Sequence, residues 1–322
     1  MLMNFQAMMI KHLYNEDSRI DIGTLSCEKT RLGRTQVNED VKLAYDANKD
    51  FILSFTDAYI VEALMHYFGM SDLNSTPCIN CPPAEWPNNT ARTTWIDKHI
   101  GSLVEKYVLA GGMEALQPKS SQNLIVDGIV VSIELSNGTM LDVVLNYGHK
   151  VLELGLLYKA LLDLCKLPDR DRGLRLLKLT MMYLKASNNL SKYAYEIMRL
   201  LVHQFCILSE KEAHEEFYGL FVNTHGKLDS HIPVDLQMVY IVKSVKKSIK
   251  HMYSNQTEKN ISRRSGSLSG INEISQNFDK CTNVLVRADK HSVVSSLDDE
   301  LTIIKDLQTV KPFDHNDGRH HP

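Results

Sequence analysis

Apolar residues recur at helical spacing through most of the chain. From Asn48 to Phe68 they fall near every third or fourth position, and this pattern predicts an amphipathic helix that ends at Gly69. From Asn146 to about residue 220, further apolar stripes follow one another, with a break at Pro168. The pattern therefore predicts a compact helical bundle with short connections between neighbouring helices.

Two helix starts in the second half of the chain carry capping signals. Ser209 is followed three positions later by Glu212, which is the pattern of a capping box. Asp235 precedes another apolar stripe, so we expect it to be the N-cap of a last long helix over residues 236–253.

One β-like stretch interrupts the helical pattern. Residues 129–135 and 139–144 are rich in β-prone types and are separated by Asn137-Gly138. An Asn-Gly pair between two such runs favours a tight hairpin turn. We therefore expect one small β-hairpin near residues 129–144.

Both ends of the chain lack a strong pattern. Apart from a short helix near residues 3–14, we expect residues 1–45 to be irregular and residues 46–254 to form the helical domain. Beyond about residue 255 the composition shifts to Ser, Asn, Asp and Lys, which predicts a mostly disordered tail over 255–322, with a short helix around 301–307. The predicted fold class is mainly α.

Composition adds few restrictions. The 322 residues are 43% hydrophobic and 23% charged, with a net charge of -3, as in an ordinary globular protein. No run of about 18 apolar residues is present, and the N-terminal residues lack the basic start and cleavage site of a signal peptide. We therefore expect no membrane partner and an intracellular location. Six cysteines are few for this length, which indicates free thiols rather than a disulfide framework.

A pair of cysteines is the first candidate for chemistry. Cys78 and Cys81 have the spacing of half a zinc site. A complete site needs a second such pair, and the sequence contains none. No Gly-rich phosphate loop is present either. We therefore predict neither a metal nor a cofactor.

The densest group of chemically active side chains lies in a polar loop at residues 221–236. Its members are Asn223, His225, Asp229, His231 and Asp235. Imidazole and carboxylate groups can bind a divalent metal or transfer protons. The same groups can instead tie loop backbone to helix ends. Because no serine or cysteine nucleophile with an obvious partner accompanies them, we favour the structural interpretation.

The last predicted helix carries lysines on one face, at positions i, i+3, i+4 and i+7: Lys243, Lys246, Lys247 and Lys250. Met238, Val242 and Val245 belong to an apolar stripe on the opposite face, and no acidic residue occurs between Asp235 and Glu258. A face of this kind can contact several phosphates of DNA or RNA. It is also typical of any solvated amphipathic helix.

Short motifs in the second half of the chain carry a family resemblance. They are Val-Leu-Asn-Tyr at 144–147, Leu-Gly-Leu-Leu at 154–157, Arg-Leu-Leu-Lys at 175–178, Phe-Val-Asn-Thr-His-Gly at 221–226 and His-Ile-Pro-Val-Asp-Leu at 231–236. Together with residues 50–69, which look like an upstream helix, they resemble a eukaryotic domain-of-unknown-function family, number 6589. The resemblance spans most of residues 8–253, and the last two motifs with their spacing are its specific part.

The resemblance implies a relationship to mobile elements. Longer members of the family carry an upstream acidic segment that suggests a ribonuclease-H-like, metal-dependent transposase core. By that comparison the chain begins after the acidic motifs and looks N-terminally truncated. Val239 and Val242 stand where the family has a Glu and an Asn, and Leu220 replaces a basic residue. Valine has no oxygen that can bind a metal.

These observations lead to a first hypothesis and two alternatives. The first is a catalytically inactive, mobile-element-derived protein with a weak nucleic-acid-binding role on the lysine face. Its vestigial site loop would contain Asn223, His225, His231 and Asp235. The second is a helical protein–protein interaction module without a role on nucleic acid. The third is a metal-dependent nuclease or transposase fragment that still works.

Overall fold

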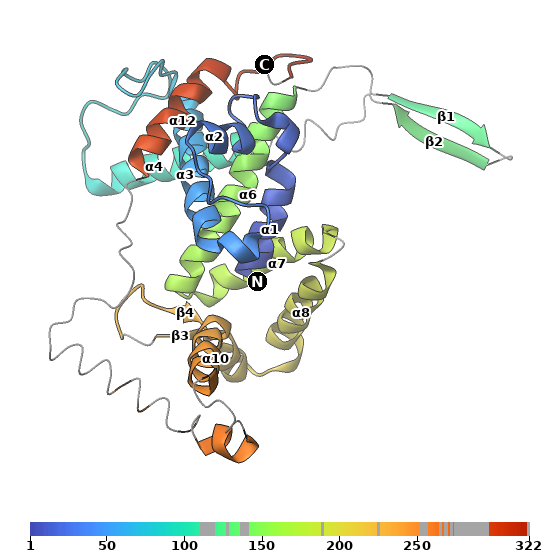
Figure 1. The fold of residues 1–322 in the computed structure, drawn as a ribbon. Helices are drawn as coiled ribbons and strands as arrows, with labels where there is room; N and C mark the ends of the chain where they lie inside the picture. Colours follow the sequence, from blue (N-terminus) through green and yellow to red (C-terminus); the bar gives the residue numbers. More distant parts are fainter. Residues whose placement is uncertain are drawn as a thin grey trace. The chain divides into compact units, whose positions relative to one another are not determined.

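The computed structural model describes residues 1–109, 120–126, 129–135, 142–187, 190–223, 226–250, 257–263, 266, 270, 273 and 296–320. The described chain is mainly helical, which confirms the predicted class (Figure 1). Its contacts divide it into two compact units. Unit one contains residues 1–160, 180–194 and 296–322, and unit two contains residues 161–179 and 195–295.

The long helix α3 (Val41–Phe68) runs through unit one. Asp40 begins it by accepting a hydrogen bond from the backbone N–H of Lys42, and the helix bends at Ala44, whose backbone is not helical. Gly69 ends it in the left-handed conformation (φ 65°), as the sequence predicts. The buried face of α3 is aromatic, with Phe51, Phe55 and Tyr59 in the core.

The first 45 residues are more ordered than the sequence predicts. Besides α1 (Leu2–Leu13), the structure has a single 3-10 turn η1 (Glu16–Ser18) and the helix α2 (Leu25–Arg31). Phe5 is fully buried in α1, and Leu25 is buried in α2. The hydroxyl of Tyr147 donates to the carbonyl of Leu13 and accepts from the N–H of Leu25, so it fixes both segments to the core. The prediction of an irregular segment is therefore wrong. The segment is ordered by contacts with residues that are distant in the sequence, such as Tyr147.

The helix α6 (Val143–Lys166) packs against α3. A Cβ on Gly155 of α6 would lie 2.4 Å from the side chain of Thr56, so only glycine allows this close approach. Tyr158 of α6 stacks on Phe5 with ring centroids 6.2 Å apart. The part of α6 up to Ala160 therefore belongs to unit one, and it contributes to the core of that unit.

The β-hairpin is present, but its strands pair differently from the expectation. β2 (Ile129–Leu135) pairs antiparallel with β1 (Ser120–Val126), which precedes it, and Val126 lies opposite Ile129. Asp127-Gly128, another turn dipeptide, lies between the strands. Of the expected partner strand, residues 139–141 lie outside the described residues. Asp142 accepts from the N–H of Leu145, and Val143 already begins α6.

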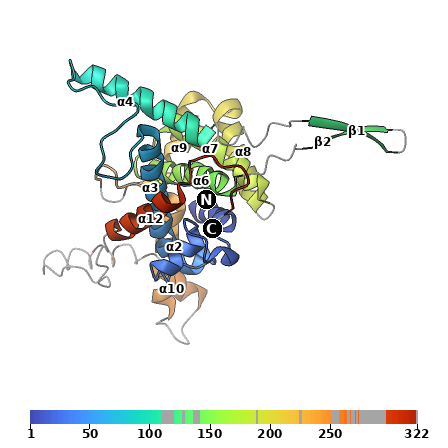
Figure 2. The same cartoon turned by 90° about the horizontal axis from the view of Figure 1, so that it is seen from above.

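The last described segment also differs from the prediction of a mostly disordered tail. Residues Leu297–Val310 form the helix α12, which lies along α3 in unit one (Figures 1 and 2). Ile303 and Leu307 are fully buried, and Phe313 is buried after the helix ends. Arg319 forms an ion pair with Asp142, which is 2% exposed. Apolar residues at helical spacing and this buried ion pair stabilise the segment. Neither feature is visible in the overall composition of the tail.

Two more helical segments belong to unit one. α4 (Asn89–Val104) begins at Asn88, whose side chain accepts from the N–H of Ala91, and it continues into the π-helical turn η2 (Glu105–Leu109). None of the side chains of α4 is buried, whereas Tyr107 of η2 is.

Unit two is built from the ends of three helices and the elements that follow them. The helices are α6, α7 (Arg170–Ala186) and α8 (Ser191–Val202), followed by η4 (His203–Ile207), α9 (Glu210–Tyr218) and α10 (Val234–Lys250). The capping box at Ser209 and Glu212 is confirmed. Phe217 of α9 is fully buried, and its ring lies where a Cβ on Gly173 would clash at 2.4 Å. This contact between α7 and α9 positions the polar loop that follows α9.

No helix among the described residues is long and apolar enough to cross a membrane.

Candidate functional site

The polar loop of unit two is closed at its base by a two-residue ladder. β3 (Phe221–Val222) pairs antiparallel with β4 (Ile232–Pro233), so Phe221 lies opposite Pro233. The N–H of Val234 also donates to the carbonyl of Leu220 (2.9 Å). This ladder holds the start of α10 against the end of α9, and the loop between them projects from a fixed base.

Asn223 organises the interior of the loop. Its Oδ1 accepts from the N–H of Gly226 and from the hydroxyl of Ser230, both at 2.8 Å. Its Nδ2 donates to the carbonyl of Lys227 (2.8 Å). Gly226 has φ 63°, a conformation that glycine adopts without strain. The amide of Asn223 is therefore committed to holding the turn, which is the structural role expected for a side chain of this kind.

The other predicted loop residues point to different parts of unit two. Nδ1 of His231 donates to the carbonyl of Lys166, the last residue of α6, at 3.1 Å. Asp235 lies inside the first turn of α10, where its Oδ1 accepts from the N–H of Leu236 (2.8 Å). It is not the N-cap that the sequence predicts, because α10 begins one residue earlier at Val234. His225 lies outside the described residues.

The described polar side chains of the loop make separate hydrogen bonds, to the turn, to the end of α6 and within α10. Over the described part of the chain, no group of three His, Cys, Asp or Glu side chains lies close enough together to hold a metal ion. Val239, where the resemblance leads us to expect a carboxylate, is 58% exposed on α10. Asn223 and His231 instead satisfy backbone groups of the turn and of a helix end.

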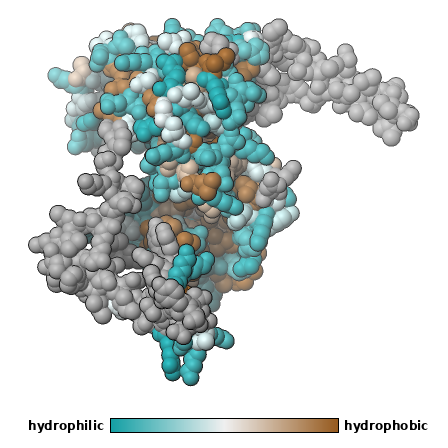
Figure 3. All heavy atoms as spheres, viewed as in Figure 1, coloured by the Kyte–Doolittle hydropathy of each residue, from teal (hydrophilic) through white to brown (hydrophobic). Residues whose placement is uncertain are grey.

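α10 presents both charge and apolar surface. Lys246 and Lys250 are exposed, whereas the side chains of Lys243 and Lys247 lie outside the description. Met238 and Val242, which the sequence places on an apolar stripe opposite the lysines, are also exposed. Figure 3 shows apolar side chains in brown at the surface, in the region where Figure 1 places β3, β4 and α10. The helix is thus available for contact with a partner on more than one face.

The cysteine pair has simple backbone partners. The thiol of Cys78 donates to the carbonyl of Thr76 (3.7 Å), and that of Cys81 donates to the carbonyl of Pro77 (3.0 Å). Both cysteines are exposed and free. These contacts lie within the bent loop that follows α3.

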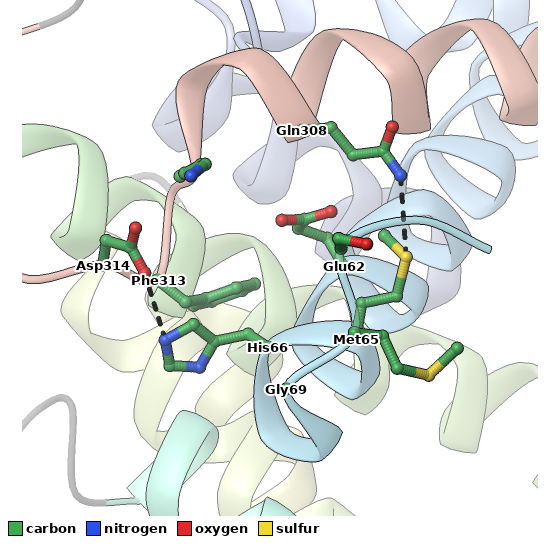
Figure 4. Close-up of a pocket in the computed structure, with 10 residues that line it drawn as sticks. Glu62, Met65, His66, Gly69, Gln308, Phe313 and Asp314 are labelled. Carbon is green, nitrogen blue, oxygen red and sulfur yellow. Dashed lines mark hydrogen bonds and ion pairs between the residues drawn. The ribbon is translucent and has the colours of Figure 1, made fainter. Parts of the chain in front are cut away.

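A second group of titratable residues, which the sequence analysis missed, lies in unit one. Glu62 and His66 lie one turn apart on α3, and Nε2 of His66 lies 3.3 Å from Oδ1 of Asp314 (Figure 4). Nδ1 of His66 lies 2.5 Å from the hydroxyl of Tyr107. With Nε2–H donating to the carboxylate, Nδ1 is left to accept from the tyrosine. The i, i+4 spacing of Glu62 and His66 is visible in the sequence, but nothing there brings Asp314 to them.

Burial changes the protonation of this group. It raises the pKa of Glu62 to about 7, and the nearby carboxylate of Asp314 adds to the shift. Burial also lowers the pKa of His66, and the positive charge of Lys106 acts in the same direction. Both effects favour the neutral imidazole, whereas the carboxylate of Asp314 acts in the opposite direction.

The comparisons with known proteins add one finding to this geometry. The model of a family of unknown function, DUF6589, matches residues 1–291. Because this match covers most of the chain, the protein belongs to that family, as the motifs predict. A search of curated proteins and a search of solved structures each find no significant match. The helix α12 and Asp314 lie beyond the matched residues.

Proposed function

We propose that this protein is a non-catalytic member of its family, derived from a mobile element, that binds nucleic acid through α10. The observation that carries the proposal is the distribution of charge on α10. The last two turns of this helix present lysines, and Asp235 is the only acidic residue in the helix.

The lysine spacing fits a phosphate backbone better than a base-reading surface. Four lysines at i, i+3, i+4 and i+7 share one helical face, and Lys246 and Lys250 are exposed on it. A lysine ammonium acts as a point charge toward phosphate and needs no fixed geometry. Binding through such contacts is independent of sequence and weakens steeply with salt. We therefore expect DNA and RNA to be bound with similar, modest affinity.

The absence of catalysis is the second part of the proposal. It is supported by Val239, which replaces the carboxylate that the mobile-element comparison leads us to expect. It is also supported by the roles of Asn223 and His231, whose hydrogen bonds are made to the loop and to α6. A site framework of this kind can persist after the metal-binding residues are lost, because its bonds stabilise the fold.

The binding part is tested by charge reversal on α10. Lys246→Glu combined with Lys250→Glu should lower affinity for duplex DNA at least about tenfold at low salt, since both substitutions place repulsion against phosphates. Lys211→Glu with Lys305→Glu, two exposed lysines on α9 and α12, is the matched control. Equal affinity of both double variants and the native protein would reject α10 as the binding surface.

A second function, protein–protein interaction, is favoured by a separate observation. Exposed apolar residues follow one face of α8 and η4, at Met198, Val202 and Phe205. Lys178 of α7 lies 4.5 Å from the centre of the Phe205 ring. Capture of a specific protein that survives nuclease treatment, and that is lost in Met198→Gln, would support this function. Capture that nuclease abolishes would assign the contact to nucleic acid.

A further inference from the structure

A hollow of about 220 Å³ lies in unit one, between the end of α3 and the segment that follows α12. Figure 4 shows the side chains that surround it, with Glu62, Met65 and His66 coming from α3 and Gln308, Phe313 and Asp314 from the C-terminal segment. The remaining lining residues are Gly69, Met70, Ser71 and Lys311. The hollow is independent of α10 and of the proposed nucleic-acid surface.

Glu62 is the buried polar group of this hollow. The residue is 7% exposed, and its Oε2 has no hydrogen-bond partner among the described residues. A buried carboxyl oxygen without a partner is costly, because it has lost its contact with water and gained nothing in return. A donor that enters the hollow can supply the missing hydrogen bond.

The surroundings of Glu62 select the charge of that donor. Asp314 also lines the hollow and carries a carboxylate, which His66 holds in place through Nε2. Lys311 is the one cation among the lining residues, and its charge lowers the pKa of Glu62, opposite to the effect of Asp314. A second positive charge would interact favourably with the carboxylate of Asp314 and with Glu62 when it is ionised, whereas an anion would be repelled by these two charges.

The walls of the hollow select the rest of the molecule. Met65 is buried, and Met70 completes a flexible, polarisable side next to it. The ring of Phe313 is buried against Tyr107, with centroids 5.0 Å apart, so its position is fixed. Aromatic and thioether groups pack well against a carbon skeleton and attract a nearby cation.

We propose that this hollow binds a small protonated amine. Its ammonium group would lie between the carboxyl groups of Glu62 and Asp314, and its carbon skeleton would contact Met65, Met70 and Phe313. An ammonium has three N–H donors, which is enough to serve Glu62 Oε2 and an oxygen of Asp314 together.

The affinity depends on pH in a defined direction. Because burial raises the pKa of Glu62 to about 7, this carboxyl is partly protonated at neutral pH and becomes fully charged above it. Asp314 pushes this pKa up, and Lys311 opposes that effect. His66 also lines the hollow, and Tyr107 is its hydrogen-bond partner. Burial lowers the pKa of His66 and raises the pKa of Tyr107, so both shifts favour the neutral forms. Amine binding therefore strengthens as the pH rises from about 6 to 8.

The ligand would also join two segments that are far apart in the sequence. Glu62 belongs to α3, whereas Asp314 follows α12. Occupancy therefore favours the docked state of the C-terminal segment by mass action. This gives a readout that does not depend on enzyme activity or on nucleic acid.

The experiment is a titration of the full-length protein with benzylamine, followed by NMR or calorimetry. Benzyl alcohol has the same ring and no charge, so it serves as the matched probe. We expect saturable binding of benzylamine, at least about tenfold weaker binding of the alcohol, and an increase in benzylamine affinity between about pH 6 and 8. Binding of both probes with equal affinity would show an apolar site and overturn the proposal.

Two variants and one control locate the site. Glu62→Gln and Asp314→Asn should each weaken benzylamine binding at least about tenfold. Asp317→Asn, three residues further along the same segment and exposed, should leave the affinity unchanged. Asp314 is half-exposed, so its variant reports on binding even where a change at the buried Glu62 disturbs folding. Native affinity in a folded Asp314→Asn variant would contradict the proposal.

Amide hydrogen exchange provides a further test of where the amine binds. Benzylamine should slow amide exchange in α12 of the native protein and leave it unchanged in Asp314→Asn. Saturable binding that protects α10 instead of α12 would place the amine elsewhere and overturn the assignment.

Discussion

The helices α12 and α10 are both amphipathic, and the structure uses them in opposite ways. α12 places Ile303 and Leu307 in the core of unit one, where neither has exposed surface. α10 leaves Met238 and Val239 more than half exposed in unit two. An apolar stripe at helical spacing therefore does not decide whether its residues are buried. The partner surface decides it, and for α12 that surface is α3.

Charge explains part of this difference. The first turn of α12 carries Asp298, Asp299 and Glu300, and Asp299 pairs with Arg34 while Asp306 pairs with Arg31. These ion pairs match α12 to the N-terminal part of its own unit. The charged face of α10 is made of lysines, and Lys246 and Lys250 are exposed. α12 therefore packs against its own chain, and we propose that α10 binds another molecule.

The largest expected effect comes from the ion pair that fixes the segment after α12. Arg319→Met leaves Asp142, which is 2% exposed, buried without its cation and should cost about 3–5 kcal/mol of unfolding free energy. Arg19→Met removes the exposed pair with Glu16 and should cost less than about 1 kcal/mol. Urea denaturation of both variants measures the difference. Equal losses would show that the C-terminal segment is not part of the folded unit.

A matched pair of truncations tests the two apolar stripes directly. Leu307→Ala on α12 should destabilise the protein by about 2–5 kcal/mol, because it creates a cavity in the core. Met238→Ala on α10 should change stability by less than about 0.5 kcal/mol, since this side chain is already exposed. Thermal or urea unfolding gives both values. A large loss at Met238 would mean that the stripe of α10 is covered in solution.

A pH titration sharpens the contrast further, because α12 buries a carboxyl pair. Burial raises the pKa of Glu28 to about 7; the N–H of Gly23 opposes the shift, and Asp306 of α12 adds to it. The folded state therefore holds this proton more tightly than the unfolded chain, in which Glu titrates near pH 4.3. The corresponding stability is complete below about pH 4 and is lost as the pH rises through 7.

We expect Glu28→Gln to remove this dependence. The amide oxygen can still accept from Gly23, and the variant should gain on the order of 2 kcal/mol relative to the native protein between about pH 5 and 8. Chemical denaturation at the two pH values measures the change. A native protein whose stability rises over this interval, or a variant that follows it in parallel, would contradict the assignment.

The smallest expected effect concerns catalysis. Val239→Glu places a carboxylate at an exposed position of α10 and should alter stability by less than about 0.5 kcal/mol. We also expect no magnesium-dependent nuclease activity, because one added carboxylate lacks the further ligands that a metal site needs. The check is a cleavage assay beside the native chain. Metal-dependent cleavage in the variant would revive the third hypothesis.

The sequence predicted local features better than long-range ones. The capping box at Ser209, the end of α3 at Gly69 and the mainly helical class depend on residues close together in the chain, and all three are confirmed. The burial of α12 and the group around His66 depend on contacts between residues more than 200 positions apart, such as His66 with Asp314. Composition and periodicity carry no signal for such pairings.

The hairpin shows a third situation, in which two local signals compete. Asn137-Gly138 and Asp127-Gly128 are both turn dipeptides, and both flank Ile129–Leu135. The strand pairs with the residues before it, Ser120–Val126, and α6 begins at Val143. For the polar loop, the sequence indicates a structural role for its polar side chains, but only the hydrogen bonds show that Asn223 holds the turn.

The most direct test of the contrast between α10 and α12 is the salt dependence of DNA binding. Four lysine–phosphate contacts predict that affinity falls roughly 150-fold between about 50 and 200 mM salt. Lys246→Gln with Lys250→Gln should reduce that fall to roughly 12-fold by removing two contacts, while Lys305→Gln on α12 should leave it unchanged. An unchanged salt dependence in the α10 variant, or a reduced one in the α12 variant, would contradict the account.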